Sequence, residues 1–111
     1  MFNRPVSTKI TFSTPEKVRD RLGHKFVGGV TLFDRRDGCA EIIIDSGLDR
    51  NIQKVYLEHE SVQLSVLRKC EPGNVDGVLG VAHFSGLEAG YKMARILGVE
   101  NQYRTIRGEK E

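Results

Sequence analysis

NIQKVYLEHESVQLSVLRKC, residues 51–70, is the stretch that decides the fold, because it predicts one long amphipathic helix. Polar residues recur along it every three or four positions and make a solvent-facing stripe. The members of this stripe are Lys54, Glu58, Ser61, Ser65, Arg68 and Lys69. At about 100° per residue, the opposite face is centred on Tyr56, Gln63, Leu67 and Cys70. His59 and Glu60 lie on either side of that centre.

Two ionisable side chains thus point toward the interior, although the same helix offers a solvent-facing stripe. Burying a charge costs free energy unless the group is paired, hydrogen-bonded or bound to a metal. His59 and Glu60 are therefore either a satisfied pair in the core or part of a functional site.

Two patterns before this helix predict the first strand and a short helix. Residues 6–12 alternate between apolar and polar side chains, which is the period of a strand with one exposed face. The sequence Thr14-Pro15-Glu16 then has a hydroxyl cap, a proline at the first helical position and an acid in the first turn. We expect this helix to end at Gly23.

A hairpin follows. The apolar runs 26–34 and 39–45 are joined by a turn that contains Asp37-Gly38, and Asp-Gly is a strong tight-turn signal. Gly28-Gly29 indicates a bulge or bend in the first of these strands. The run Ile42-Ile43-Ile44 indicates a strand that is covered on both faces.

A second helix is predicted over residues 76–97, and small residues recur on it every four positions. This strip consists of Ala82, Gly86, Gly90 and Ala94. Glycine weakens a helix by about 1 kcal/mol relative to alanine, so its presence indicates close approach to a neighbouring helix or a ligand. The strip is also a candidate contact with a partner helix, including that of a second copy of the chain.

These elements define an α+β fold in the order β-α-β-β-α-α. We expect a small antiparallel sheet, made of the hairpin and the N-terminal strand, packed against two long antiparallel helices. The chain of 111 residues suits one domain. We assign residues 1–98 to this domain and the charged segment 99–111 to a C-terminal tail.

Composition restricts the setting and the partners. The sequence has no apolar run of about 18 residues that could span a membrane, and no apolar segment typical of a signal peptide near its N-terminus. We therefore expect a cytoplasmic location, or the host cytoplasm if the chain is virus-encoded. The net charge is +2, and the sequence has no finger motif or aromatic stacking set, so nucleic acid is not the expected partner.

His83 is the residue most readily placed beside His59. It is expected on the inward side of the second helix, and two helices joined by a short turn pack antiparallel, which would bring the two rings together. Imidazole and carboxylate groups are ligands that zinc favours. His59, His83 and one carboxylate are therefore a candidate metal site, with zinc as the candidate ion.

The strand 39–45 and the following helix with Leu57-Glu58-His59-Glu60 resemble the core of the zincin metallopeptidases, especially their minimal forms. In that family an edge strand precedes a helix that carries His-Glu-x-x-His. The resemblance implies that His59 is a zinc ligand and that Glu60 is the general base that activates a zinc-bound water. The second histidine of the motif corresponds to Gln63, a poor zinc ligand, so the resemblance implies an altered site.

Two alternatives remain open at this level. In the first, His59 bonds to Gln63 or to a backbone carbonyl and His83 pairs with Glu60, so that the group only fixes the register of the helices. The protein would then be a non-catalytic interaction or adaptor protein that binds another protein or a peptide. In the second, it is a metal-dependent hydrolase acting through Glu60.

Overall fold

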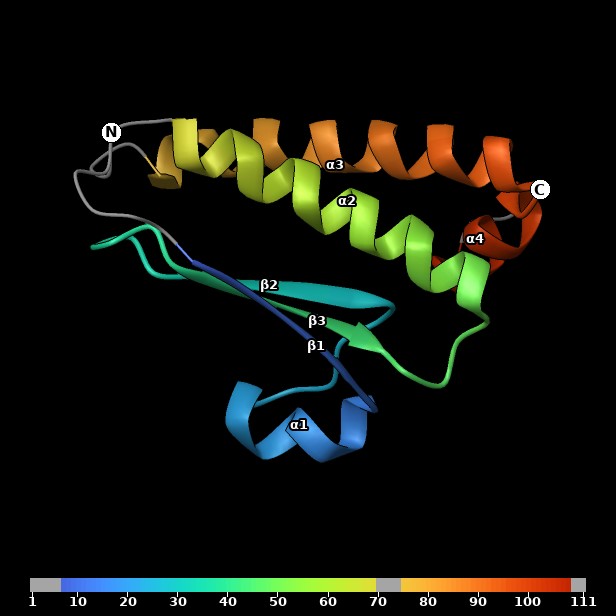
Figure 1. The fold of residues 1–111 in the computed structure, drawn as a ribbon, viewed down its shortest axis with the longest axis horizontal. Coiled ribbons are helices and arrows are strands. Elements are labelled where there is room, and N and C mark those ends of the chain that lie inside the picture. The colour runs from blue at the N-terminus through green and yellow to red at the C-terminus, as the bar shows by residue number, and fades with distance from the viewer. Residues whose placement is uncertain (1–6, 70–74, 109–111) are drawn as a thin grey trace.

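The computed structural model describes residues 7–69 and 75–108 and shows a small sheet with helices on both faces (Figure 1). The predicted α+β class is confirmed. The expected turn at 71–74, Cys70 before it and the end of the expected tail, 109–111, lie outside the described residues. In the described part of the chain, no helix is both long enough and apolar enough to cross a membrane.

The sheet has three strands, β1 (Thr8–Ser13), β2 (Gly29–Phe33) and β3 (Ala40–Asp45), in the order β1-β3-β2. The predicted hairpin is confirmed, because β2 pairs antiparallel with β3. The expectation of a purely antiparallel sheet is wrong, because β1 pairs parallel with β3. Helix α1 (Pro15–Leu22) lies between β1 and β2 in the chain, and β3 is inserted between those strands in the sheet.

The isoleucine run of β3 is covered on both faces, as the sequence indicated. Ile42 and Ile44 pack in the cluster that includes Ile52 and Val55 of helix α2 (Arg50–Lys69). Ile43 points the other way, into the cluster of Val18 and Phe26 beside α1. The centre of the sheet is thus the centre of the core.

The long helices α2 and α3 (Val75–Leu97) run side by side in opposite directions (Figure 1). Their close approach depends on the small-residue strip, whose four members are all buried. A Cβ atom at Gly86 would lie 2.7 Å from the backbone oxygen of His59, and one at Gly90 would lie 2.6 Å from Tyr103 Oη. The strip therefore packs within the chain, and it does not offer the surface for a second copy that the sequence left open.

The segment expected to be a tail contains a further helix, α4 (Glu100–Ile106). Its Tyr103 is fully buried, with its ring 5.2 Å from that of Tyr56 and 5.1 Å from that of Tyr91. The sequence predicts a tail because most residues of the segment are polar or charged. Burial of the aromatic side chain of Tyr103 instead stabilises the short helix against the rest of the protein.

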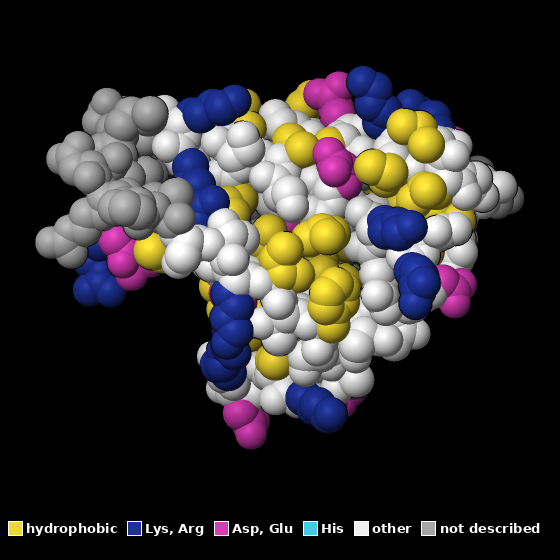
Figure 2. Space-filling model, viewed as in Figure 1, with side chains coloured by type: hydrophobic (Ala, Val, Ile, Leu, Met, Phe, Trp, Pro, Cys, Tyr) yellow, Lys and Arg dark blue, Asp and Glu magenta, His cyan; other side chains and the backbone are white. Residues whose placement is uncertain are grey.

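The strand β1 leaves part of the sheet uncovered. Its side chains Ile10 and Phe12 are 47% and 52% exposed. They share a face with their partners Ile42 and Ile44, which α2 covers. Figure 2 has the same view as Figure 1 and shows hydrophobic side chains gathered in the middle of the face where β1 and α2 lie.

Candidate active site

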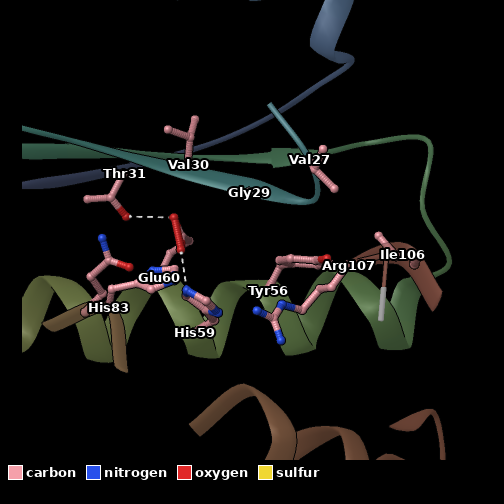
Figure 3. A pocket seen from close by; sticks show the side chains of 12 residues that line it. Val27, Gly29, Val30, Thr31, Tyr56, His59, Glu60, His83, Ile106 and Arg107 are labelled. Carbon is pink, nitrogen blue, oxygen red and sulfur yellow. Dashed lines mark hydrogen bonds and ion pairs between the residues drawn. The ribbon is translucent and has the colours of Figure 1, made fainter. Parts of the chain in front are cut away.

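A cleft of about 440 Å³ lies between β2, α2, α3 and the C-terminal end of α4. Figure 3 shows His83, Glu60 and Thr31 toward one end of this cleft, and Val27, Arg107 and Ile106 toward the other, with His59 and Tyr56 between them. The full lining is Val27, Gly29, Val30, Thr31, Tyr56, His59, Glu60, Gln63, His83, Ile106, Arg107 and Gly108. The helix that decided the fold thus supplies four side chains to one cavity.

The Gly28-Gly29 pair lets α2 approach the strand closely at this cleft. Gly28 has a φ of +79°, and a Cβ atom there would overlap the ring of Tyr56. A Cβ atom at Gly29 would lie 3.3 Å from Cγ of Glu60. The two glycines therefore make the space in which Tyr56 and Glu60 reach the cleft.

Glu60 is a buried carboxyl group, with 5% of its surface exposed. Thr31 Oγ1 donates a hydrogen bond to Oε1 at 3.3 Å, and Oε2 lies 3.4 Å from His59 Nε2. Burial disfavours the charged form and raises the pKa of Glu60 to about 7, although the bond from Thr31 acts in the opposite direction. At neutral pH this carboxyl group can both accept and release a proton.

His59 is buried to a similar degree, and its Nδ1 lies 3.2 Å from Tyr103 Oη. Burial lowers the pKa of His59 to about 4, and the nearby charges of His83 and Arg107 lower it further, against a hydrogen bond with Gln63. The imidazole is therefore neutral at neutral pH. Burial disfavours the charged form of both groups, so the contact between His59 and Glu60 is a polar contact and not an ion pair.

A neutral imidazole donates through one nitrogen and accepts through the other. When Glu60 is protonated, its O–H can donate to His59 Nε2 while Nδ1–H donates to Tyr103 Oη. When Glu60 is ionised, Nε2–H can donate to the carboxylate and Tyr103 O–H can donate to Nδ1. The contacts accommodate both states of Glu60 without moving a side chain.

His83 lies beside His59, as the sequence predicted, but it is exposed, which corrects the expectation that it points inward. The two ring centroids are 5.5 Å apart, with an angle of 62° between the planes. The inward line of α3 runs through Ala82, so the next residue, about 100° further around the helix, falls at the rim of the cleft.

The fit of these residues to zinc is incomplete. Catalytic zinc sites have three protein ligands and an open position for water. Within 7–69 and 75–108, no group of three or more His, Cys, Asp or Glu side chains is placed to hold a metal ion. Gln63 stands where a third imidazole would complete the set and instead bonds to His59. The cleft therefore offers two adjoining imidazoles, His59 and His83, and does not fit a three-ligand zinc centre.

Sequence reasoning missed Tyr103 and Arg107, and it treated Tyr56 only as an inward residue. A signal for α4 was present, because Val99, Tyr103 and Ile106 are spaced for one face of a helix. Arg107 stacks on the rings of Tyr91 and Tyr103, 5.4 and 5.7 Å from their centroids. Helix α2, which lines the cleft, ends at Lys69, 38 positions before Arg107. No sequence pattern shows that Arg107 reaches the same cleft.

Comparison with protein-family models, with curated proteins and with solved structures gave no match.

Proposed function

We propose that this protein is a small metallopeptidase-like protein with an altered centre, which binds an extended peptide in the cleft and uses Glu60 for proton transfer. One observation carries the proposal: the buried carboxyl group of Glu60 lies between the imidazole of His59 and Thr31 of the edge strand β2, in a cleft that His83 also lines. Burial raises its pKa to about 7. Strongly perturbed carboxyl groups inside clefts are characteristic of catalytic acids and bases.

The strand β2 supports binding of a peptide. It is at the edge of the sheet and pairs with β3 on one side, and its residues Gly29, Val30 and Thr31 line the cleft. An edge strand presents backbone N–H and C=O groups that an extended peptide can pair with. A peptide added there would run past Glu60.

Glu60 would act on the peptide bond as a base and then as an acid. The ionised carboxylate takes a proton from water as the water oxygen bonds to the peptide carbonyl carbon. It then returns that proton to the peptide nitrogen as the C–N bond breaks, which leaves a carboxylic acid and an amine. Thr31 holds Oε1 throughout, and His59 Nε2 faces Oε2.

A zinc ion would lower the pKa of a bound water and polarise the carbonyl group. Of the described residues, His59 and His83 are the candidates to hold it. Because the set is one imidazole short of a usual catalytic site, the proton transfer assigned to Glu60 does not depend on the ion.

The test is hydrolysis of a mixture of synthetic peptides, followed by mass spectrometry, with zinc and with chelator. We expect slow cleavage by the wild-type protein, with kcat/KM rising as pH passes through about 7, because the base must be ionised. Glu60→Gln should retain peptide binding and lose cleavage. Cleavage that persists in Glu60→Gln would refute the role of this residue.

A second function, a non-catalytic peptide-binding adaptor, is favoured by one observation. His59 hydrogen-bonds to Tyr103 of α4 as well as to Gln63 of its own helix, and so joins α2 to α4 as a structural residue would. Peptide binding by the wild-type protein without cleavage in zinc or in chelator would support the adaptor function over the enzyme.

A further inference from the structure

We infer that the Tyr56–Arg107 end of the cleft binds the C-terminal carboxylate of the peptide, so that the protein selects peptides by their free C-terminus. This inference rests on the proposed function, because it assumes that the ligand of the cleft is a peptide. The carboxylate site would determine which peptides bind and in which direction.

Tyr56 supplies the first observation. Its side chain is 3% exposed and lines the cleft, yet its hydroxyl oxygen has no hydrogen-bond partner among the described residues. A buried hydroxyl without a partner costs stability, and such groups are uncommon in folded proteins. A ligand oxygen placed in the cleft would accept the missing hydrogen bond.

Arg107 supplies the second observation at the same place. Its guanidinium donates to Tyr91 Oη and lies over the rings of Tyr91 and Tyr103, so its position is fixed before any ligand arrives. It also lines the cleft beside Tyr56 (Figure 3). The planar fork of N–H groups in arginine matches the two oxygens of a carboxylate.

The charges in the cleft give the ligand a direction. The cation of Arg107 attracts an anionic group to this end, whereas the other end, at Glu60 and Thr31, has a carboxyl group and a hydroxyl group and, among the described residues, no arginine or lysine. The C-terminus of a peptide would therefore lie at Arg107 and its preceding residues at Glu60.

The spacing between Tyr56 and Glu60 determines how many peptide residues would lie between the cleaved peptide bond and the C-terminus. Tyr56 and Glu60 are one turn apart on α2, about 6 Å along its axis. An extended peptide advances about 3.3–3.6 Å per residue, so about two residues fit between the two positions. Val27 and Ile106 form apolar walls there, which suits peptides with an apolar side chain near the C-terminus.

The test is calorimetric titration at pH 7 with acetyl-trialanine as the free acid and as the C-terminal amide. The free acid should bind about tenfold more tightly than the amide, which is typical of hydrogen bonds to a charged group. In Tyr56→Phe, which loses only the unpartnered hydroxyl, this preference should fall to about threefold or less while the melting temperature stays the same or rises. Arg107→Gln should also reduce the preference.

Arg104→Gln is the matched control. Arg104 also stacks on Tyr91, at 4.8 Å, but it does not line the cleft, so the preference for the free acid should persist. Equal binding of acid and amide, or an unchanged preference in Tyr56→Phe, would overturn the inference. Displacement of the free-acid peptide by an equal concentration of inorganic phosphate would also overturn the inference, because the site would then bind anions in general.

The result is distinct from that of the hydrolysis test. Preference for the acid without cleavage keeps the carboxylate site and removes the enzymatic function. Cleavage without that preference keeps the enzyme and removes the carboxylate site.

Discussion

His59 Nδ1 lies 3.2 Å from Tyr103 Oη, although the two residues are 44 positions apart in the chain. Both side chains are buried, so the bond connects α2 to α4 inside the protein. The bond also fixes the ring of His59 and thereby directs Nε2 toward Glu60.

Tyr103→Phe should therefore lower the free energy of unfolding by about 1 kcal/mol, because it leaves a buried imidazole nitrogen without its partner. Chemical denaturation of Tyr103→Phe, His59→Leu and the double variant measures the coupling between the two residues. A coupling energy indistinguishable from zero would show that the contact does not stabilise the fold.

Glu60→Gln should change how stability depends on pH. The folded state holds the proton of Glu60 up to about pH 7, whereas the unfolded chain loses it near its ordinary pKa of 4.5. The unfolded state then binds fewer protons, so this group makes the protein less stable as pH rises from 4.5 to 7, by up to about 3 kcal/mol. Relative to wild type, Glu60→Gln should gain stability across this window in urea denaturation. A difference that does not vary with pH would contradict the raised pKa.

His59→Gln should show the opposite slope. The pKa of His59 is lowered to about 4 from 6.5, so the unfolded chain binds a proton first as pH falls. The wild-type protein should lose up to about 3 kcal/mol from this residue between pH 6.5 and 4, and the variant should avoid that loss. If both variants keep the wild-type pH dependence, neither pKa shift is present in solution.

Gly86→Ala should destabilise the protein by about 1–3 kcal/mol, the usual cost of overpacking a core, because the new Cβ atom would meet the backbone of His59. Gly80→Ala is the control on the same helix, where nothing lies within 4 Å of the added atom. It should stabilise the protein by about 0.5–1 kcal/mol through helix propensity. Thermal unfolding of the two variants in parallel measures the difference. Equal effects would mean that α2 and α3 are not in close contact.

Gln63→His should create the third ligand that the cleft lacks. We expect the wild-type protein to bind zinc weakly, through His59 and His83, and Gln63→His to bind it at least about tenfold more tightly. Gln53→His places the same substitution on α2 away from the cleft and should have no effect. The measurement is competition with a zinc chelator. Unchanged affinity in Gln63→His would show that the two imidazoles cannot share an ion.

The sequence predicted the elements whose patterns are local. The amphipathic helix over 51–69, the Asp37-Gly38 hairpin and the two-faced burial of β3 are all present. The sequence also predicted that His59 and His83 lie side by side, because a small-residue strip and a short connection determine how α2 and α3 pack.

The sequence could not predict features that depend on the whole fold. β1 has a parallel neighbour because it adds to the β3 edge of the hairpin. Either edge of a hairpin can accept a strand, so the sequence of β1 alone does not decide between them. His83 lies about 100° around α3 from the buried line of Ala82, and how far that position is covered depends on the elements packed around it. Arg107 lines the cleft, and Tyr103 contacts His59 behind it, only because α4 folds back onto α2.

The sheet order also predicts the order in which the strands pair during folding. The hairpin β2–β3 joins neighbours in the chain, whereas β1 must pair with β3 across α1 and β2, for example Thr8 with Ala40. Long-range pairing costs more loop entropy and therefore occurs late. The guanidinium of Arg68 secures the assembled strand by donating to Ser7, Thr8 and Gly38. Substitutions in β1 or at Arg68 should therefore change the unfolding rate much more than the folding rate.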